Sequence, residues 1–288
     1  MDVDTYSDSK VKAFANKYLI SMKIDAEKGE GIDLAKQYGV RGFPTIIISN
    51  DKGEEIDRII GYRPPEPFLK ELKRIYSGKN TLPAMLEDFQ QNPTKFNTLF
   101  KLAKKYESMN DPSSAKRMVN TILDAGTDSA GTAAFFSILY DARETKDPIP
   151  LITYADKTPN SENSTVALGE AMRFVRRAGE NPDLEADLYV RIVNGLKDPN
   201  PSRLNGFSWR MSELEKNMDL ALEKIIWAID HVTDEEQKYM FLDTKAELLW
   251  KMGRVDEAIS EIEKCVSYKP EDTYYNEQLE KFKKSLNS

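Results

Sequence analysis

The spacing of apolar residues divides the chain into two parts with different periodicity. Up to about residue 80, short β-branched runs alternate with helix-like segments and are separated by glycines and polar turns. Short β-branched runs bounded by turn residues are typical of strands, whereas apolar residues three and four apart are typical of helices. The pattern predicts, in order, a helix capped by Ser7, a strand at 19–24, a helix at 32–38, strands at 45–49 and 55–60, and a helix at 65–76.

Two details of this first part bear on how it packs. The run Thr45–Ser49 is apolar without alternation, which is typical of a strand buried on both faces. Residues 50–53 read Asn-Asp-Lys-Gly, a hairpin-type connection that pairs this strand with the next one. Gly39 follows the short helix and is suited to end it in the left-handed conformation.

Helical spacing continues from residue 80 almost to the end of the chain, with no comparably strong strand-like run. The boundary is a small polar stretch followed by a proline, at 76–83. We therefore expect three parts: an α/β domain at 1–79, divergent helical hairpins at 80–200, and better defined helical hairpins with a C-terminal capping helix at 201–288.

Charge and composition narrow the classes of partner. The chain has 288 residues, 40% hydrophobic and 31% charged, with 41 basic and 48 acidic side chains. Such a chain buries a sizeable core, and its acidity without a basic stripe argues against nucleic acid and anionic membranes. We also expect no membrane span, because no apolar run approaches the ~18 residues that one needs, and no leader-like stretch opens the chain.

The rarest residues limit the chemistry. A single cysteine, Cys265, permits no internal disulfide, no dithiol redox pair and no cysteine-built zinc site. The single histidine, His231, follows a predicted helix end, where an imidazolium suits the helix dipole, and no nucleophile motif lies nearby. We expect Cys265 to be a buried inert thiol between packed helices. Neither a metal ion nor a cofactor is predicted.

The first part resembles the C-terminal two-thirds of the thioredoxin fold. The resemblance rests on Lys23–Asp25, the helix-like stretch Gly31–Val40 and the loop Arg41–Thr45 that follows it. In that family a loop with a cis-proline faces the active-site cysteines, and Pro44 matches this proline. Phe43 stands before the proline where a threonine is common in thioredoxins. The resemblance therefore implies a cis peptide bond at Pro44 and a peptide-binding groove.

The same resemblance implies that part of the fold is absent from the sequence. The family's first strand, first helix, second strand and Cys-x-x-Cys turn would all precede Met1, and the second strand would lie centrally. Residues 19–24 and 45–49 would then pair with each other, recruit another strand or leave edges unpaired. We expect Met1 to be an internal methionine of a longer parent. The alternative is a natural half-domain that has lost its chemistry.

The family's chemistry is thiol–disulfide exchange, in which a thiolate at a helix N-terminus attacks a disulfide and a second cysteine resolves it. The chain as written has no such pair, so we expect it to bind rather than catalyse, through Phe43, Pro44, Thr45, Gly61 and Tyr62. Its clients would be extended peptide or protein segments that pair with this loop in the manner of a strand. For the cellular compartment, we expect the cytoplasm for the chain as written. A leader sequence before Met1 would instead imply a periplasmic or secreted protein.

The helical part resembles tetratricopeptide repeats, whose two helices pack at small residues and turn at a glycine. The C-terminal unit carries seven matching positions: Ala246, Leu249, Gly253, Ala258, Ile262, Cys265 and Pro270. A unit before it contains Trp209, Ala221, Ile225 and Ala228, and a third contains Leu99, Ala103, Tyr106, Ala115, Val119 and Ile122. Such arrays present a concave surface to a peptide or protein.

Two hypotheses follow from these resemblances. In the first, the parent is a thiol–disulfide oxidoreductase whose helical repeats select a partner protein. In the second, the chain is a non-catalytic interaction scaffold with a degenerate thioredoxin fold. Both predict binding of a protein or peptide by this chain, and neither predicts disulfide reduction by it.

Overall fold

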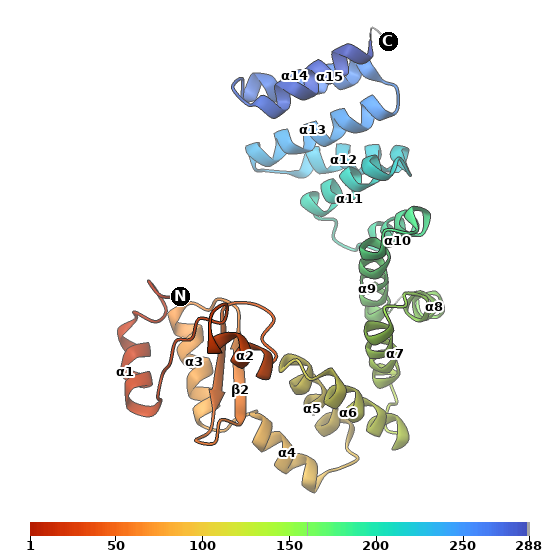
Figure 1. The fold of residues 1–288 in the computed structure, drawn as a ribbon. Helices are drawn as coiled ribbons and strands as arrows, with labels where there is room; N and C mark the ends of the chain where they lie inside the picture. The colour runs from red at the N-terminus through yellow and green to blue at the C-terminus, as the bar shows by residue number, and fades with distance from the viewer. Residues whose placement is uncertain (160, 287–288) are drawn as a thin grey trace. The chain divides into compact units, whose positions relative to one another are not determined.

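The computed structural model describes residues 1–159 and 161–286, which form two compact units, Met1–Asp141 and Ala142–Ser288. The expected fold class is confirmed: a small α/β part at the N-terminus is followed by helices only (Figure 1). The first unit contains α1 (Ser9–Tyr18), α2 (Glu30–Gln37), β1 (Thr45–Ser49), β2 (Glu55–Ile60), α3 (Pro65–Tyr76), α4 (Leu82–Gln91), α5 (Phe96–Ser108), α6 (Pro112–Asp124) and the start of α7 (Thr132–Thr145).

The sheet of the first unit has two antiparallel strands, β1 and β2, at the places the sequence predicts. Thr45 pairs with Ile60 and Ile47 with Arg58, and the register shifts at Ile48/Ser49. The connecting turn is closed by a hydrogen bond from the Asn50 N–H to the Glu54 carbonyl (2.9 Å). The hairpin prediction is therefore confirmed, including its turn.

Three details of the prediction are wrong. Residues 19–24 are not a strand: they lack a ladder partner in the described residues, and Ile20 and Met22 are 96% and 80% exposed. β1 is only partly buried rather than covered on both faces. The cap of α1 is Asp8, whose carboxylate accepts from the N–H groups of Lys10 and Val11, and not Ser7.

The core of the α/β part lies between the sheet and the helices α1 and α3. Ile59 of β2 and Val11 of α1 are buried against an apolar stripe of α3. That stripe follows helical periodicity, so one face of α3 is apolar and the other polar. Its buried members are Phe68, Leu72 and Ile75.

A buried carboxylate joins the sheet to the helices. Asp57 of β2, 2% exposed at its side chain, accepts from the Arg74 guanidinium of α3 at 2.8 Å and from the Lys105 ammonium of α5 at 2.6 Å. Removal of one partner of a buried ion cluster leaves the remaining charges uncompensated, which is strongly destabilising. Asp57 thereby ties β2 to the following helical hairpin within the first unit.

Helical hairpins follow at the positions that the spacing of small residues predicts. α5 and α6 pack through fully buried residues that belong to the predicted unit, namely Leu99, Ala103, Ala115, Val119 and Ile122. The turn between these helices contains Asn110 at φ 61°, and the turn after α13 (Glu235–Lys251) contains Gly253 at φ 78°. Asparagine and glycine are the residues that adopt this left-handed conformation most readily.

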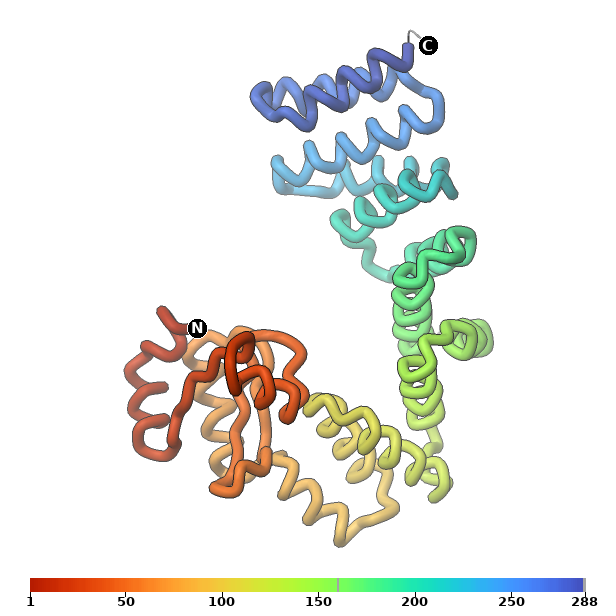
Figure 2. The backbone as a smooth tube through the Cα atoms, viewed as in Figure 1, coloured from red at the N-terminus to blue at the C-terminus, as the bar shows by residue number. Residues whose placement is uncertain are grey.

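The described residues of the second unit form helices joined by turns and loops, with no strand among them. It continues from α7 with α8 (Ile149–Lys157), α9 (Glu162–Ala178), α10 (Pro182–Asn194), α11 (Pro201–Leu214), α12 (Met218–His231), α13, α14 (Val255–Tyr268) and α15 (Thr273–Ser285). From α11 to α15 the chain runs back and forth in successive packed helices (Figure 2). One core cluster runs through them and includes Ala221, Ala246, Ala258 and Cys265, all 0% exposed.

We predict that Asp57→Asn destabilises the protein by about 3 kcal/mol, because it leaves the Lys105 ammonium and the Arg74 guanidinium without their shared carboxylate. Urea unfolding followed by far-UV circular dichroism measures this change. The control is Asp51→Asn at the exposed tip of the hairpin, which should shift the free energy of unfolding by less than about 0.5 kcal/mol. An Asp57→Asn protein as stable as the wild type would contradict the role given to this cluster.

Candidate peptide-binding site

The loop before β1 and the loop after β2 lie side by side. The Phe43–Pro44 peptide bond is cis, as the resemblance implies. The Gly61 N–H donates to the Pro44 carbonyl at 2.8 Å, which extends the hairpin ladder by one pair, and the Thr45 hydroxyl donates to the Gly42 carbonyl at 2.7 Å. The structure thus brings Phe43, Pro44, Thr45, Gly61 and Tyr62 together at one end of the sheet.

At this end of the sheet, backbone N–H and C=O groups of alternate β1 residues point away from β2. In an antiparallel ladder, residues alternate between those bonded to the partner strand and those that face outward. Since Pro44 is bonded to Gly61, the outward-facing residues of β1 are Thr45 and Ile47. Among the described residues no strand pairs with this edge of β1. This edge of β1 therefore presents free backbone hydrogen-bond donors and acceptors with which an extended peptide could pair.

The side chains around the loop are apolar and exposed. Phe43 is 63% exposed, Tyr62 56% and Ile60 51%. Large aromatic side chains beside an unpaired edge supply apolar contact area to a bound segment. Backbone pairing and apolar contact together suit an extended peptide with apolar side chains.

An interaction with the N-terminal segment fixes Tyr62, and sequence reasoning missed it. The Tyr62 hydroxyl donates to the Asp4 carboxylate at 2.5 Å, and the Thr5 hydroxyl donates to the Arg63 carbonyl at 2.6 Å. The hydrogen bond from Tyr62 lowers the pKa of Asp4 and raises that of the tyrosine. These residues lie 58 positions apart, and no local pattern in the sequence signals such a contact.

The lone cysteine is unsuited to thiol chemistry. Cys265 is fully buried, its thiol donates weakly to the Tyr239 carbonyl at 3.4 Å, and burial raises its pKa to about 12. Because the thiolate is the nucleophile in disulfide exchange, a thiol with so high a pKa is inert at neutral pH. The expectation of a buried thiol is confirmed.

The single histidine makes local contacts at the end of α12. A ring nitrogen of His231 lies 2.8 Å from the Trp227 carbonyl, and its ring stacks on that of Trp227 with centroids 3.8 Å apart. The contacts anchor the imidazole to its own helix. Both contacts are with Trp227 of the same helix, so His231 acts within the end of α12.

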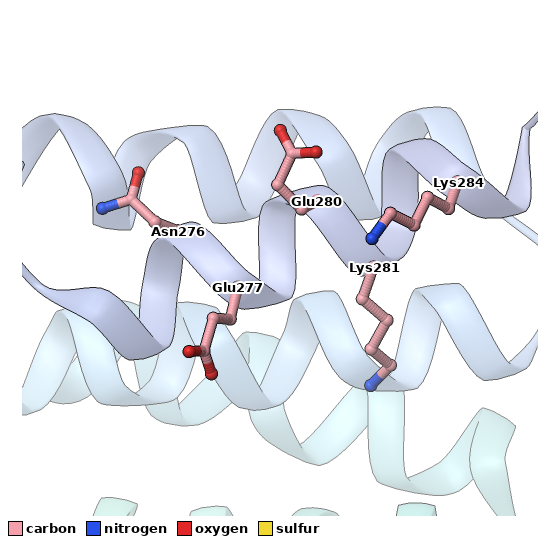
Figure 3. A pocket seen from close by; sticks show the side chains of 5 residues that line it. All are labelled: Asn276, Glu277, Glu280, Lys281 and Lys284. Carbon is pink, nitrogen blue, oxygen red and sulfur yellow. The ribbon is translucent and has the colours of Figure 1, made fainter.

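A shallow hollow of about 710 Å³ lies along α15 (Figure 3). It is lined by Asn276, Glu277, Glu280, Lys281 and Lys284. Lys281 donates to the Glu247 carboxylate at 2.7 Å and lies 3.9 Å from the Trp250 ring centroid. The Trp250 indole N–H donates in turn to the Ser285 hydroxyl at 2.8 Å. These contacts attach α15 to α13, and the role of α15 as a capping helix stays a prediction.

Comparison with known proteins supports the assignment of the α/β part. Residues 2–76 match the family model of the thioredoxin-like domain. The N-terminal fold is thioredoxin-like. The match covers about a quarter of the chain, and the helical part has no such support, so its tetratricopeptide character stays a prediction.

Two curated relatives match a part of the chain. The thiol:disulfide interchange protein DsbD of Yersinia pestis (strain Pestoides F) is 35% identical over 72 residues, which are 24% of this chain and 12% of the relative. The SPbeta prophage-derived thioredoxin-like protein YosR of Bacillus subtilis (strain 168) is 42% identical over 43 residues, 14% of this chain and 54% of the relative. The chain thus spans a small part of the first relative and about half of the second.

In residues 1–159 and 161–286, His, Cys, Asp and Glu side chains form no group of three or more that could hold a metal ion. Over the same residues, no helix is both long enough and apolar enough to cross a membrane.

A buried carboxylate where α15 meets α13 generates a pH prediction. Burial raises the pKa of Asp243 to about 6, Tyr274 donates to its Oδ2 at 3.2 Å, and Oδ1 has no hydrogen-bond partner among the described residues. Glu247 and Asp272 also raise this pKa, whereas Lys281 lowers it. The native state thus favours the protonated acid, and stability falls as pH rises from about 4 to about 6.

We predict that Asp243→Asn stabilises the second unit at pH 7.5 by roughly 2 kcal/mol and has little effect near pH 4, where the native carboxyl is already protonated. All three tryptophans lie in this unit, so tryptophan fluorescence during urea unfolding measures the effect. Exposed Glu271→Gln in the adjacent turn is the control and should show no such pH dependence. An equal gain for Asp243→Asn at both pH values would refute the assignment.

Proposed function

We propose that this chain is a protein-binding module that holds an extended client segment at the loop formed by Phe43, Pro44, Thr45, Gly61 and Tyr62. The observation that carries the proposal is the unpaired edge of β1, which continues into this loop beside exposed aromatic side chains. Addition of a strand to such an edge is a common mode of peptide recognition. The helices from α11 to α15 would supply a second contact surface for the same client.

We further propose that the longer protein containing this region is a thiol–disulfide oxidoreductase. The match to DsbD supports this, since the name of that relative describes thiol:disulfide interchange. In such a protein a Cys-x-x-Cys turn elsewhere in the chain would provide the nucleophile, and the residues described here would bind the substrate. That cysteine pair, and not Cys265, would attack the substrate disulfide and resolve the mixed disulfide.

The alternative is a non-catalytic scaffold with a degenerate thioredoxin fold. The interactions of Tyr62 with Asp4, and of Thr5 with Arg63, favour it because they fix the N-terminal segment against the loop without any cysteine. The mass of the polypeptide isolated from its native cells separates the two proposals. Upstream residues containing a Cys-x-x-Cys sequence would support the oxidoreductase.

We predict that Phe43→Asp weakens binding of S-carboxymethylated insulin B chain, an unfolded peptide without disulfides, by about tenfold, because it removes apolar contact area and places a charge beside the edge. Titrations followed by ¹⁵N NMR would show shifts at Thr45 and Ile47. Ile32→Ser removes an apolar side chain that is 39% exposed on α2 and serves as the control. Absence of saturable binding, or equal weakening by both variants, would contradict the proposal.

We predict that the 288-residue chain does not accelerate the reduction of insulin by dithiothreitol, because Cys265 is alone and its pKa is about 12. The turbidity of the precipitating B chain measures this reaction. Thioredoxin serves as the positive control, and Cys265→Ser should behave like the wild type. Reduction above the background rate would show that a thiol in this chain takes part.

A further inference from the structure

A second groove lies on the first unit, away from the residues of the cis-proline loop. It has a volume of about 610 Å³ and lies between α1 and α3, which pack beside each other (Figure 1). Its lining comes from these two helices only: Lys10, Ala13, Phe14, Tyr18, Leu69, Lys73 and Tyr76. None of these residues belongs to the proposed client site.

Three aromatic rings form the apolar part of the groove. The ring centroids of Phe14 and Tyr18 are 4.9 Å apart, those of Phe14 and Tyr76 5.8 Å, and those of Tyr18 and Tyr76 4.7 Å. Tyr18 and Tyr76 are still 40% and 56% exposed. Clustered aromatic rings at a surface are the side chains on which binding energy concentrates in protein interfaces.

The rim of the groove is positively charged and uncompensated. Lys10 and Lys73 line it, and the Lys17 ammonium lies 4.9 Å from the Tyr18 ring centroid. No carboxylate is among the lining residues, and none forms an ion pair with these three lysines in the described part of the chain. These lysines lie within residues 1–79, which carry 14 basic and 13 acidic side chains, although the whole chain has a net charge of −7.

We propose that this groove binds an acidic peptide segment of a partner protein. An aromatic or aliphatic side chain of the segment would pack against Tyr18 and Tyr76, and its carboxylates would lie near Lys10, Lys17 and Lys73. Charge complementarity selects this partner, because aspartate and glutamate would compensate ammonium groups that form no ion pair among the residues that the structure describes. The inference is independent of the proposed function, since it uses other residues and another ligand chemistry.

The surroundings favour a peptide over an anionic membrane. The aromatic rings pack against one another in a shallow groove, whereas insertion into a bilayer requires apolar side chains that project from a broad face. Asp8 caps α1 and Glu66 lies in the first turn of α3, so the N-terminal ends of both helices carry negative charge, whereas their last turns carry lysine or arginine. A flat anionic surface would meet these carboxylates together with the lysines, whereas a peptide segment can lie along the lysines alone.

The test uses the full chain and a fluorescein-labelled amidated peptide that alternates glutamate with leucine and phenylalanine. Fluorescence anisotropy should show saturable binding that weakens as salt concentration rises, because screening reduces the attraction between exposed charges. A matched peptide with lysine in place of every glutamate should bind at least about tenfold more weakly. Unsaturable binding of the acidic peptide, or equal binding of both peptides, would overturn the proposal.

Charge-reversal variants locate the binding. The pair Lys10→Glu and Lys73→Glu should weaken binding of the acidic peptide by about tenfold or more. The pair Lys12→Glu and Lys70→Glu makes the same charge change on the same two helices outside the groove, and should weaken binding by less than about threefold. Equal weakening by both pairs would show attraction by net charge alone and would refute the groove.

Two further measurements complete the test. Tyr76→Ser should weaken peptide binding while far-UV circular dichroism stays unchanged, because Tyr76 is an exposed anchor and not part of the buried core. Vesicles of phosphatidylserine and phosphatidylcholine test whether the groove binds an anionic membrane instead of a peptide. Vesicle binding that Lys10→Glu with Lys73→Glu abolishes, without binding of the acidic peptide, would overturn the proposal in favour of a membrane-facing surface.

Discussion

The fold of the first unit depends on burying one face of a sheet that has only two strands. An isolated two-stranded hairpin is at best marginally stable in water, so β1 and β2 need the apolar stripe of α3 against them. Asp57 adds a polar constraint to this apolar one, because its carboxylate bonds to Arg74 of α3 and to Lys105 of α5. The cis-proline loop is positioned by the same hairpin, since the Gly61 N–H donates to the Pro44 carbonyl.

Local patterns in the sequence were sufficient where local interactions form the structure. The helix at 65–76 and the hairpin at 45–60 follow from apolar spacing and from a turn that closes on itself. Residues 19–24 have the composition of a strand and yet lack strand pairing, because a strand exists only when another strand supplies its hydrogen bonds. The contacts of Tyr62 with Asp4 and of Asp57 with Lys105 were also beyond prediction, since they join residues 58 and 48 positions apart.

The packing of the helices was more predictable from the sequence in the C-terminal part of the chain than between residues 130 and 200. From α11 onward, alanines and one cysteine at regular spacing mark where helices approach closely, and the structure buries these residues completely. Between residues 130 and 200 the helices α8 to α10 lack that regular spacing, so helicity was predictable there but the packing register was not. The candidate client site is similar: the resemblance identified its residues, whereas the exposure of Phe43 and the unpaired edge required the three-dimensional structure.

The open edge of β1 also affects how the protein behaves in concentrated solution. Thr45–Ser49 is an uncharged segment rich in isoleucine, and such a segment at an unpaired edge promotes strand pairing between molecules. The charges nearest to it in the sequence are Arg41 and the Asp51–Lys52 pair, so repulsion between whole molecules must keep these edges apart. That repulsion vanishes near the isoelectric point of about 5.1. Pairing between molecules through this edge should therefore increase on acidification toward pH 5, where the repulsion is weakest.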